Sequence, residues 1–135
     1  QQLSGGQLQR THFARCLAQL DNNSPTPKLL LLDEPTSALD IHHQHRCLHL
    51  AYEFAQAGNL VLAVMHDLNL AALYADHIIL LDQGKLLAYG PPQQVLQAAE
   101  LSRLYRTSMF VSAHPRLRCP IIFSEPHTRC GKPSA

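Results

Sequence analysis

The sequence predicts an α/β fold in which a parallel sheet with flanking helices is followed by a hairpin and further helices. Two apolar runs without a polar interruption, residues 29–32 and 60–65, have the composition of strands that a parallel sheet buries on both faces. Between them, residues 41–57 have the pattern of a helix that Gly58 ends. The order strand, helix, strand is that of a βαβ unit, so we expect the two strands to be parallel.

The first elements follow from capping and turn residues. Ser4 precedes a helix expected over residues 5–20, because its hydroxyl oxygen can accept a hydrogen bond from a free N–H of the first turn. Residues 21–27 contain Asn, Ser and two prolines and are expected to form a loop. Pro35 lacks an N–H and therefore ends the first strand.

The remaining elements are shorter. Gln83-Gly84 lies between two apolar runs and is a hairpin signal, and Pro91-Pro92 can open a helix. We expect, in order, a short helix, the two strands of the hairpin and two final helices, over residues 68–74, 78–82, 85–89, 91–98 and 100–105.

A change in composition predicts a domain boundary near Thr107. Residues 108–135 contain four prolines, and four Lys and Arg residues against a single Glu. We therefore expect a globular part over residues 1–107 and a basic, Pro-rich C-terminal tail over residues 108–135 that is extended or loosely packed.

Composition excludes several classes of protein. The 135 residues are 46% hydrophobic and 16% charged, with a net charge of +1, so the chain as a whole has no electrostatic reason to bind nucleic acid. No apolar run approaches the roughly 18 residues that a transmembrane helix needs. The four cysteines form no CxxC pair, which favours free thiols over a zinc site or a disulfide framework.

Three chemically active side chains are expected at one edge of the sheet. Asp33 and Glu34 end the first predicted strand, and His66 follows the second. Parallel strands present their carboxyl ends at the same edge, which is where ligands bind in such sheets. The sequence therefore predicts two carboxylates and an imidazole close together.

Four short motifs resemble those of the ATP-binding cassette ATPases, a branch of the P-loop NTPases, and occur in that family's order. They are a signature sequence, a Walker B strand with its following glutamate, a D-loop and a switch histidine: Leu3-Ser4-Gly5-Gly6-Gln7, residues 29–34, Ser37-Ala38-Leu39-Asp40 and His66. The resemblance covers roughly residues 1–105. It implies the C-terminal half of an ABC-type nucleotide-binding domain.

The resemblance implies ATP and Mg²⁺ as cofactors and a role for each motif. Asp33 would hold Mg²⁺, and Glu34 would act as the general base that polarises the attacking water. His66 would donate a hydrogen bond to the γ-phosphate, and Asp40 would lie at the seam between two subunits. The signature residues would contact the nucleotide held by the opposite subunit, where glycines permit close approach of a phosphate: Ser4, Gly5, Gly6 and Gln7.

The phosphate-binding pattern GxxxxGK[ST] does not occur in these 135 residues. The two Gly-Lys pairs, at Gly84 and Gly131, are followed by Leu and Pro. The sequence also starts at Gln1 rather than at Met. We therefore expect a C-terminal fragment that, on its own, neither binds nor hydrolyses MgATP.

Further residues indicate which class of ATP-binding cassette ATPase the sequence resembles. Tyr74-Ala75-Asp76-His77, leading into the strand at residues 78–81, resembles importers of iron chelates and vitamin B12. Residues 36–45 and His114-Pro115 are most similar to the hemin import ATP-binding proteins. This resemblance implies the ATP-hydrolysing, energy-coupling subunit of a bacterial hemin importer.

Such a subunit would form a homodimer, bind an integral membrane permease and act indirectly with a periplasmic substrate-binding protein. It would be peripheral to the cytoplasmic face of the inner membrane and would not bind nucleic acid. A ferric-siderophore or vitamin B12 importer ATPase, a non-transport cassette ATPase and a catalytically inactive fragment stay open as alternatives.

Histidines are numerous, and three of them share one face of the predicted helix over residues 41–57. His42, His45 and His49 are spaced by three and four residues, a spacing that could bind a metal ion. The ordinary interpretation is a solvated helix face, and we adopt it.

Overall fold

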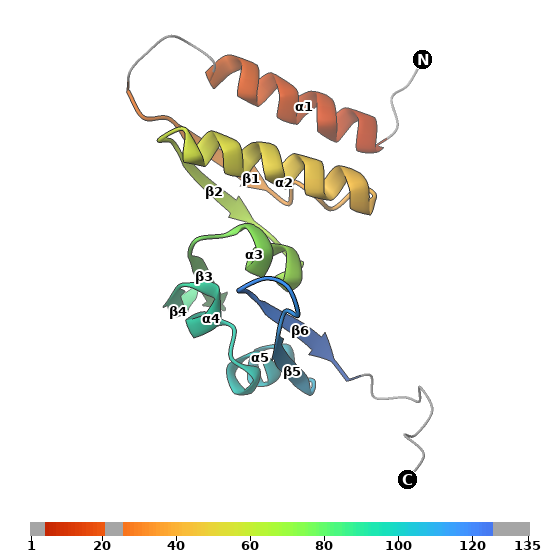
Figure 1. Ribbon diagram of the computed structural model, residues 1–135, viewed down its shortest axis with the longest axis vertical. Helices are drawn as coiled ribbons and strands as arrows, with labels where there is room; N and C mark the ends of the chain where they lie inside the picture. The colour runs from red at the N-terminus through yellow and green to blue at the C-terminus, as the bar shows by residue number, and fades with distance from the viewer. Residues whose placement is uncertain (1–4, 21–25, 126–135) are drawn as a thin grey trace. The chain divides into compact units, whose positions relative to one another are not determined.

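The computed structural model describes residues 5–20 and 26–125, which form two compact units, the first ending at His66 and the second beginning at Asp67 (Figure 1). The elements in chain order are α1 (Gly5–Leu20), β1 (Leu29–Asp33), α2 (Ile41–Gln56), β2 (Leu60–Val64), α3 (Leu68–Tyr74), β3 (Ile78–Asp82), β4 (Lys85–Gly90), α4 (Pro92–Val95), α5 (Ala98–Tyr105), β5 (Met109–Ala113) and β6 (Pro120–Ser124). No helix among the described residues is long and apolar enough to span a bilayer.

The first unit is built on the predicted βαβ arrangement. Strands β1 and β2 pair in parallel, in a register that runs from Leu29 opposite Leu60 to Asp33 opposite Val64. Helix α2 packs on this pair and buries three of its side chains: Cys47, Leu48 and Ala51. On β1, Leu30 is only 3% exposed. Gly58, with a φ of 87°, follows the helix end as expected.

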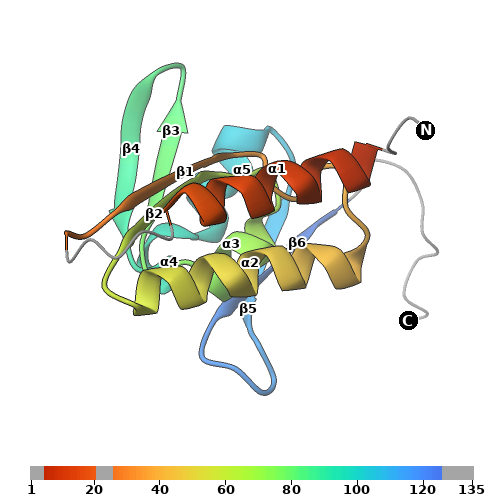
Figure 2. The ribbon, with the colours of Figure 1, turned by 90° about the horizontal axis from the view of Figure 1, so that it is seen from above.

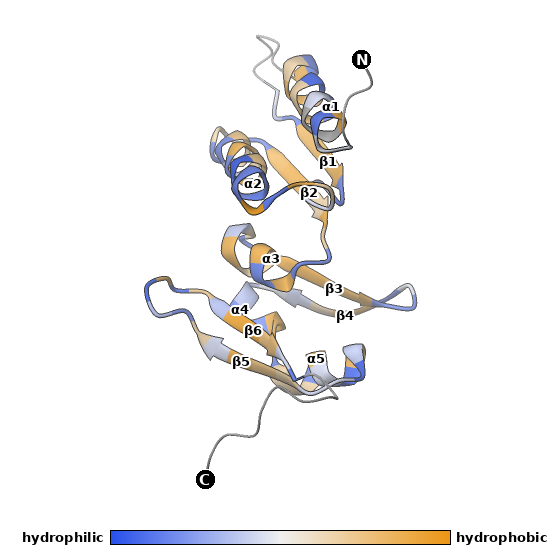
Figure 3. Ribbon diagram, turned by 90° about the vertical axis from the view of Figure 1, so that its right-hand side faces the viewer, coloured by the Kyte–Doolittle hydropathy of each residue, from blue (hydrophilic) through white to orange (hydrophobic). Residues whose placement is uncertain are grey.

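The opposite side chains of the β1–β2 pair are exposed. Alternate residues of a strand point to opposite faces, and the exposed fractions along the uncovered face are about half or more: Leu29 51%, Leu31 64%, Leu60 63%, Leu62 50% and Val64 54%. Figure 3 shows both strands in the orange of hydrophobic residues. The described residues therefore cover only one face of β1 and β2, although strands of this composition are commonly buried on both faces.

The second unit contains two antiparallel pairs. Strands β3 and β4 form the predicted hairpin, seen side by side in Figure 2, and the turn residues Gln83 and Gly84 have φ values of 48° and 75°. Two positive φ values are what the tightest hairpin turns require, and they explain the Gln-Gly pair. A bulge between Leu80 and Leu81 shifts the register.

The helices after this hairpin differ from the prediction. Helix α4 ends at Val95 rather than near residue 98, because Gln97 adopts an extended conformation, and α5 begins at Ala98. The break turns the chain so that Leu96 and Leu101, both 0% exposed, enter the same core. Local helix signals do not encode such a turn, since burial of two side chains decides it.

The expectation of an extended or loosely packed chain after Thr107 is wrong for residues 109–124. These residues form the antiparallel pair β5–β6, in which Met109 lies opposite Ser124 and Ala113 opposite Pro120. Ile122 is 6% exposed and belongs to the core of the second unit. Pro120 is tolerated because it is the first residue of its strand. Whether the chain divides into domains at Thr107 stays a prediction.

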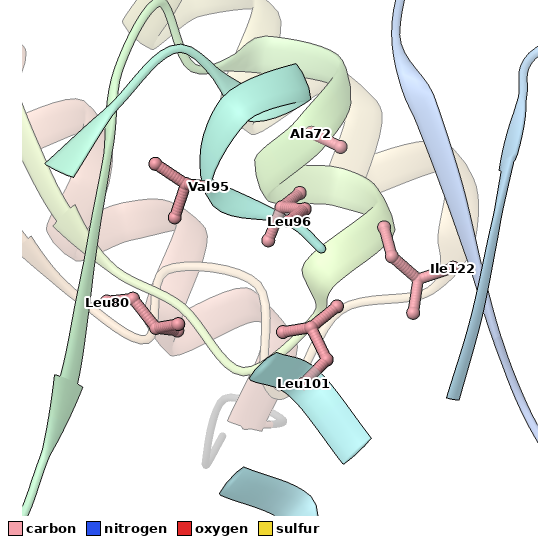
Figure 4. Close-up of a cluster of buried hydrophobic side chains, with 6 residues drawn as sticks. All are labelled: Ala72, Leu80, Val95, Leu96, Leu101 and Ile122. Carbon is pink, nitrogen blue, oxygen red and sulfur yellow. The ribbon is translucent and has the colours of Figure 1, made fainter. Parts of the chain in front are cut away.

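The core of the second unit gathers side chains from every part of it (Figure 4). Helices α3 and α5, the α4 segment, strand β3 and strand β6 contribute the cluster: Ala72, Leu80, Val95, Leu96, Leu101 and Ile122. The β5–β6 pair is thus part of this core.

Asn69 connects α3 to β6 and provides a test of this packing. Its side-chain amide donates to the carbonyl oxygen of Ile122 at 3.1 Å and accepts from the Ile122 N–H at 2.8 Å. We expect Asn69→Ala to lower the free energy of unfolding by about 1–3 kcal/mol, because both backbone groups lose a partner. Urea unfolding would measure the change. Ser124→Ala, on an exposed position of β6, is the control, and an equal effect of the two variants would contradict the role of Asn69.

Candidate active site

The edge of the sheet after β1 has an unusual backbone. Asp33 is the last residue of β1, and Glu34 follows it with a φ of 46°, in the left-handed region that residues other than glycine seldom adopt. The Glu34 N–H still donates to the carbonyl oxygen of Val64 at 3.0 Å, which extends the ladder by one bond. Ser37 holds the turn, because its N–H and its hydroxyl both donate to the Glu34 carbonyl oxygen, at 3.3 and 3.1 Å.

This turn places Glu34 against His66. Glu34 Oε1 and His66 Nε2 are 2.6 Å apart, although the residues are 32 positions apart in sequence. The side chains are 43% and 76% exposed, so the pair is open to solvent and to a ligand. The sequence predicted two carboxylates and an imidazole close together at this edge, and the structure confirms this for Glu34 and His66.

The turn after Glu34 is fastened to the start of α2. Thr36 is 7% exposed, and its carbonyl oxygen accepts a hydrogen bond from the Gln44 side chain at 3.2 Å. Cys47 is also buried, with its Sγ 3.9 Å from the carbonyl oxygen of Pro35, and burial raises the pKa of its thiol. Two successive turns of α2 therefore support the loop that leads to Asp40.

Asp40 is the N-cap of α2. Its Oδ1 accepts a hydrogen bond from the His43 N–H at 2.9 Å and lies 2.7 Å from His43 Nδ1. These bonds lower the pKa of the Asp40 carboxyl, the backbone bond most and the ring next. The carboxylate form is the one that these donors favour.

Comparisons with curated proteins and with solved structures both found proteins of ATP-binding cassette transporters. No protein-family model matches the chain. A hemin import ATP-binding protein, HmuV of Idiomarina loihiensis, is 56% identical over 124 residues, which are 92% of this chain and 48% of that relative. HmuV of Aliivibrio fischeri is 47% identical over 122 residues, 90% of this chain and 46% of the relative. The chain spans about half the length of the curated relatives that it matches.

Solved structures give the same result. A metal-chelate type ABC transporter in an inward-facing conformation matches 93% of this chain and 48% of its own, with a TM-score of 0.74 and 30% identity. The chain has the fold of part of an ATP-binding cassette nucleotide-binding domain. A dimeric ATP-binding cassette in a post-hydrolysis state, bound to ADP and phosphate, matches 67% of this chain and 36% of its own, with a TM-score of 0.57 and 37% identity.

Residues of the signature-like sequence form the start of α1. Gly5, Gly6 and Gln7 form its first turn, whereas Ser4 lies outside the described residues. A Cβ on Gly6 would come within 2.9 Å of the Ala38 carbonyl oxygen, so this position has no room for a side chain. The structure therefore brings the start of the signature helix against the loop between Glu34 and Asp40, while a Cβ on Gly5 would meet open space.

The donor groups at the edge fit a magnesium ion that also binds phosphate. Among the described residues, no group of three or more His, Cys, Asp or Glu side chains could hold a metal ion. Mg²⁺ commonly binds one or two protein carboxylates and completes its shell with substrate phosphates and waters. Asp33, an exposed carboxylate at the end of β1, suits that arrangement.

Two of the three histidines on α2 have contacts on the same helix. His49 lies 3.5 Å from Glu53, and the exposed His42 packs edge-on against the ring of His43, with centroids 5.3 Å apart. That this helix face is only solvated stays a prediction.

Sequence reasoning missed the residues that hold the loop in place. The Ser37 hydroxyl donates to the backbone of Glu34. The Gln44 side chain donates to the backbone of Thr36, and the His43 ring contacts Asp40. The only available signal was their spacing: a serine three residues after Glu34, and a histidine three residues after the N-cap Asp40.

Proposed function

We propose that this chain supplies part of an ATP-hydrolysing subunit of a bacterial ABC importer, and that hemin is the imported substrate. The 2.6 Å contact between Glu34 and His66 is the main structural support, because it brings together a carboxylate that would act as the base and an imidazole that would bind phosphate. The names of the 56% and 47% identical relatives support hemin.

Asp33 would bind the Mg²⁺ that accompanies ATP, which screens the charge of the phosphates when bound. Glu34 would accept the proton of the water that attacks the γ-phosphorus. His66 would hold Glu34 on one side and donate to the γ-phosphate. The left-handed backbone at Glu34 would keep the Glu34 side chain in this orientation during the reaction.

The remaining site residues would act between two copies of the subunit. Ser4, Gly5, Gly6 and Gln7 would contact the nucleotide bound by the other copy, using free N–H groups at the start of α1. Asp40 would lie at the seam. The close approach of Gly6 to Ala38 supports this, since it makes the signature and the D-loop neighbours on one surface.

The exposed apolar face of β1 and β2 fits a role within a larger domain. Curated relatives are about twice as long as this chain, and a complete cassette would contain the phosphate-binding half that these 135 residues lack. That half could cover Leu31, Leu60 and Leu62, which burial would stabilise. We further propose peripheral attachment to a permease at the cytoplasmic face of the inner membrane, with a periplasmic binding protein that delivers substrate.

Transport by a complete subunit assembled with its permease in proteoliposomes would test the substrate. We expect ATP-dependent uptake of hemin when the hemin-loaded binding protein is outside, and no uptake of a ferric siderophore or of cobalamin. Uptake of either rival instead of hemin would contradict the substrate assignment and leave the importer assignment intact. Absence of any ATP hydrolysis would contradict the proposed function itself.

A further inference from the structure

The contact between His43 and Asp40 has features that an N-cap alone does not need. Capping requires one bond from a backbone N–H to the Asp40 carboxylate, and His43 provides it at 2.9 Å. The His43 ring adds a second contact at 2.7 Å, again to Oδ1. Since the acceptor is a carboxylate, Nδ1 must carry the proton in this contact.

Both bonds go to the same oxygen of Asp40. Among the described residues, no other hydrogen bond or ion pair involves the Asp40 side chain, so Oδ2 keeps its lone pairs. The Asp40 side chain is 68% exposed, whereas that of His43 is 29% exposed. The half-buried ring therefore fixes one oxygen and leaves the other facing solvent.

The surroundings of Asp40 make His43 the dominant influence on it. His43 and, more weakly, His42 are the side chains that lower the pKa of the Asp40 carboxyl. Residues 35–39 and the first turn of α1, which approaches Ala38, contain no titratable side chain.

We propose that His43 is a positioning residue for Asp40, which holds the carboxylate so that Oδ2 faces a donor on the second copy of the subunit. The inference rests on the proposed function, in which Asp40 lies at the subunit seam.

The pKa of the Asp40 carboxyl is lowered, so the stabilisation that its carboxylate provides is present above the ordinary carboxyl pKa and is lost only as pH falls through the lowered value.

The test uses three variants of a complete subunit and measures the dissociation constant of its MgATP-dependent dimer. We expect His43→Ala to weaken the dimer about three- to fivefold, the range that an exposed ionic contact supports, with MgATP binding to the monomer unchanged. His43→Asn presents an N–H near the place of Nδ1, so it should restore most of the dimer. His42→Ala, which removes the neighbouring ring, is the control and should leave the constant within about twofold.

Rescue by His43→Asn separates positioning through the N–H from a purely structural role of the ring. An unchanged dimer in His43→Ala, or a His43→Asn dimer as weak as that of His43→Ala, would overturn the proposal. If the parent neither dimerises with MgATP nor hydrolyses it, the proposed function fails, whatever residue 43 does.

Discussion

Glu34→Gln is expected to lower ATP hydrolysis by a complete subunit by about 100-fold or more, the lower end of what a general base contributes. The substitution keeps the shape of the side chain and removes its basicity, while Asp33 stays available to Mg²⁺. The affinity for MgATP should therefore stay within a few-fold of the parent, and the ATP-bound dimer should accumulate because its release follows hydrolysis.

Phosphate release under saturating MgATP would measure the rate, and sedimentation would measure the dimer. Glu53→Gln is a matched control, because the exposed Glu53 carboxylate lies 3.5 Å from the exposed His49 and far along α2 from the turn. A Glu34→Gln enzyme that retains the parental rate would show that another group is the base.

Leu101→Ala is expected to destabilise the second unit by about 2–5 kcal/mol. Leu101 is 0% exposed, and the substitution removes its contacts and leaves a cavity in the cluster of Figure 4. Whole domains are stable by only about 5–15 kcal/mol, so the loss is a large share of the total.

Urea unfolding followed by circular dichroism would measure this effect. Leu86→Ala is the matched control, since Leu86 is 63% exposed on β4 and loses little contact on truncation. Its effect should stay within about 0.5 kcal/mol. Equal midpoints for the two variants would contradict the assignment of Leu101 to the core.

Elements with strong local signals could be predicted from the sequence alone. The bounds of α1 and α3 agree with the prediction, because a cap or a loop residue marks each end and the helical pattern is local. The edge that joins Glu34 to His66 was also predictable, since parallel pairing of two apolar strands leaves little choice in where their ends lie.

Other features depended on contacts between distant residues. Strands β5 and β6 escaped notice because they are short, and prolines flank or begin them. The two strands pair with each other, with Val111 opposite Ile122. The Asn69 side chain, 53 residues before Ile122, also bonds to the Ile122 backbone, so the pair becomes part of the core. The early end of α4 has a similar cause, since a turn after Val95 lets Leu96 and Leu101 be buried together.

The sequence by itself determined the order of elements from α1 to α5 and which residue types stand at the candidate site. Only the tertiary structure decided how those residues are held: the left-handed backbone of Glu34, the support of its turn by Ser37 and Gln44, and the contact of His43 with Asp40. The physical reason is that hydrophobic periodicity and capping act within a few residues. The orientation of a side chain at the site depends instead on hydrogen bonds and burial, which form once separate segments have packed together.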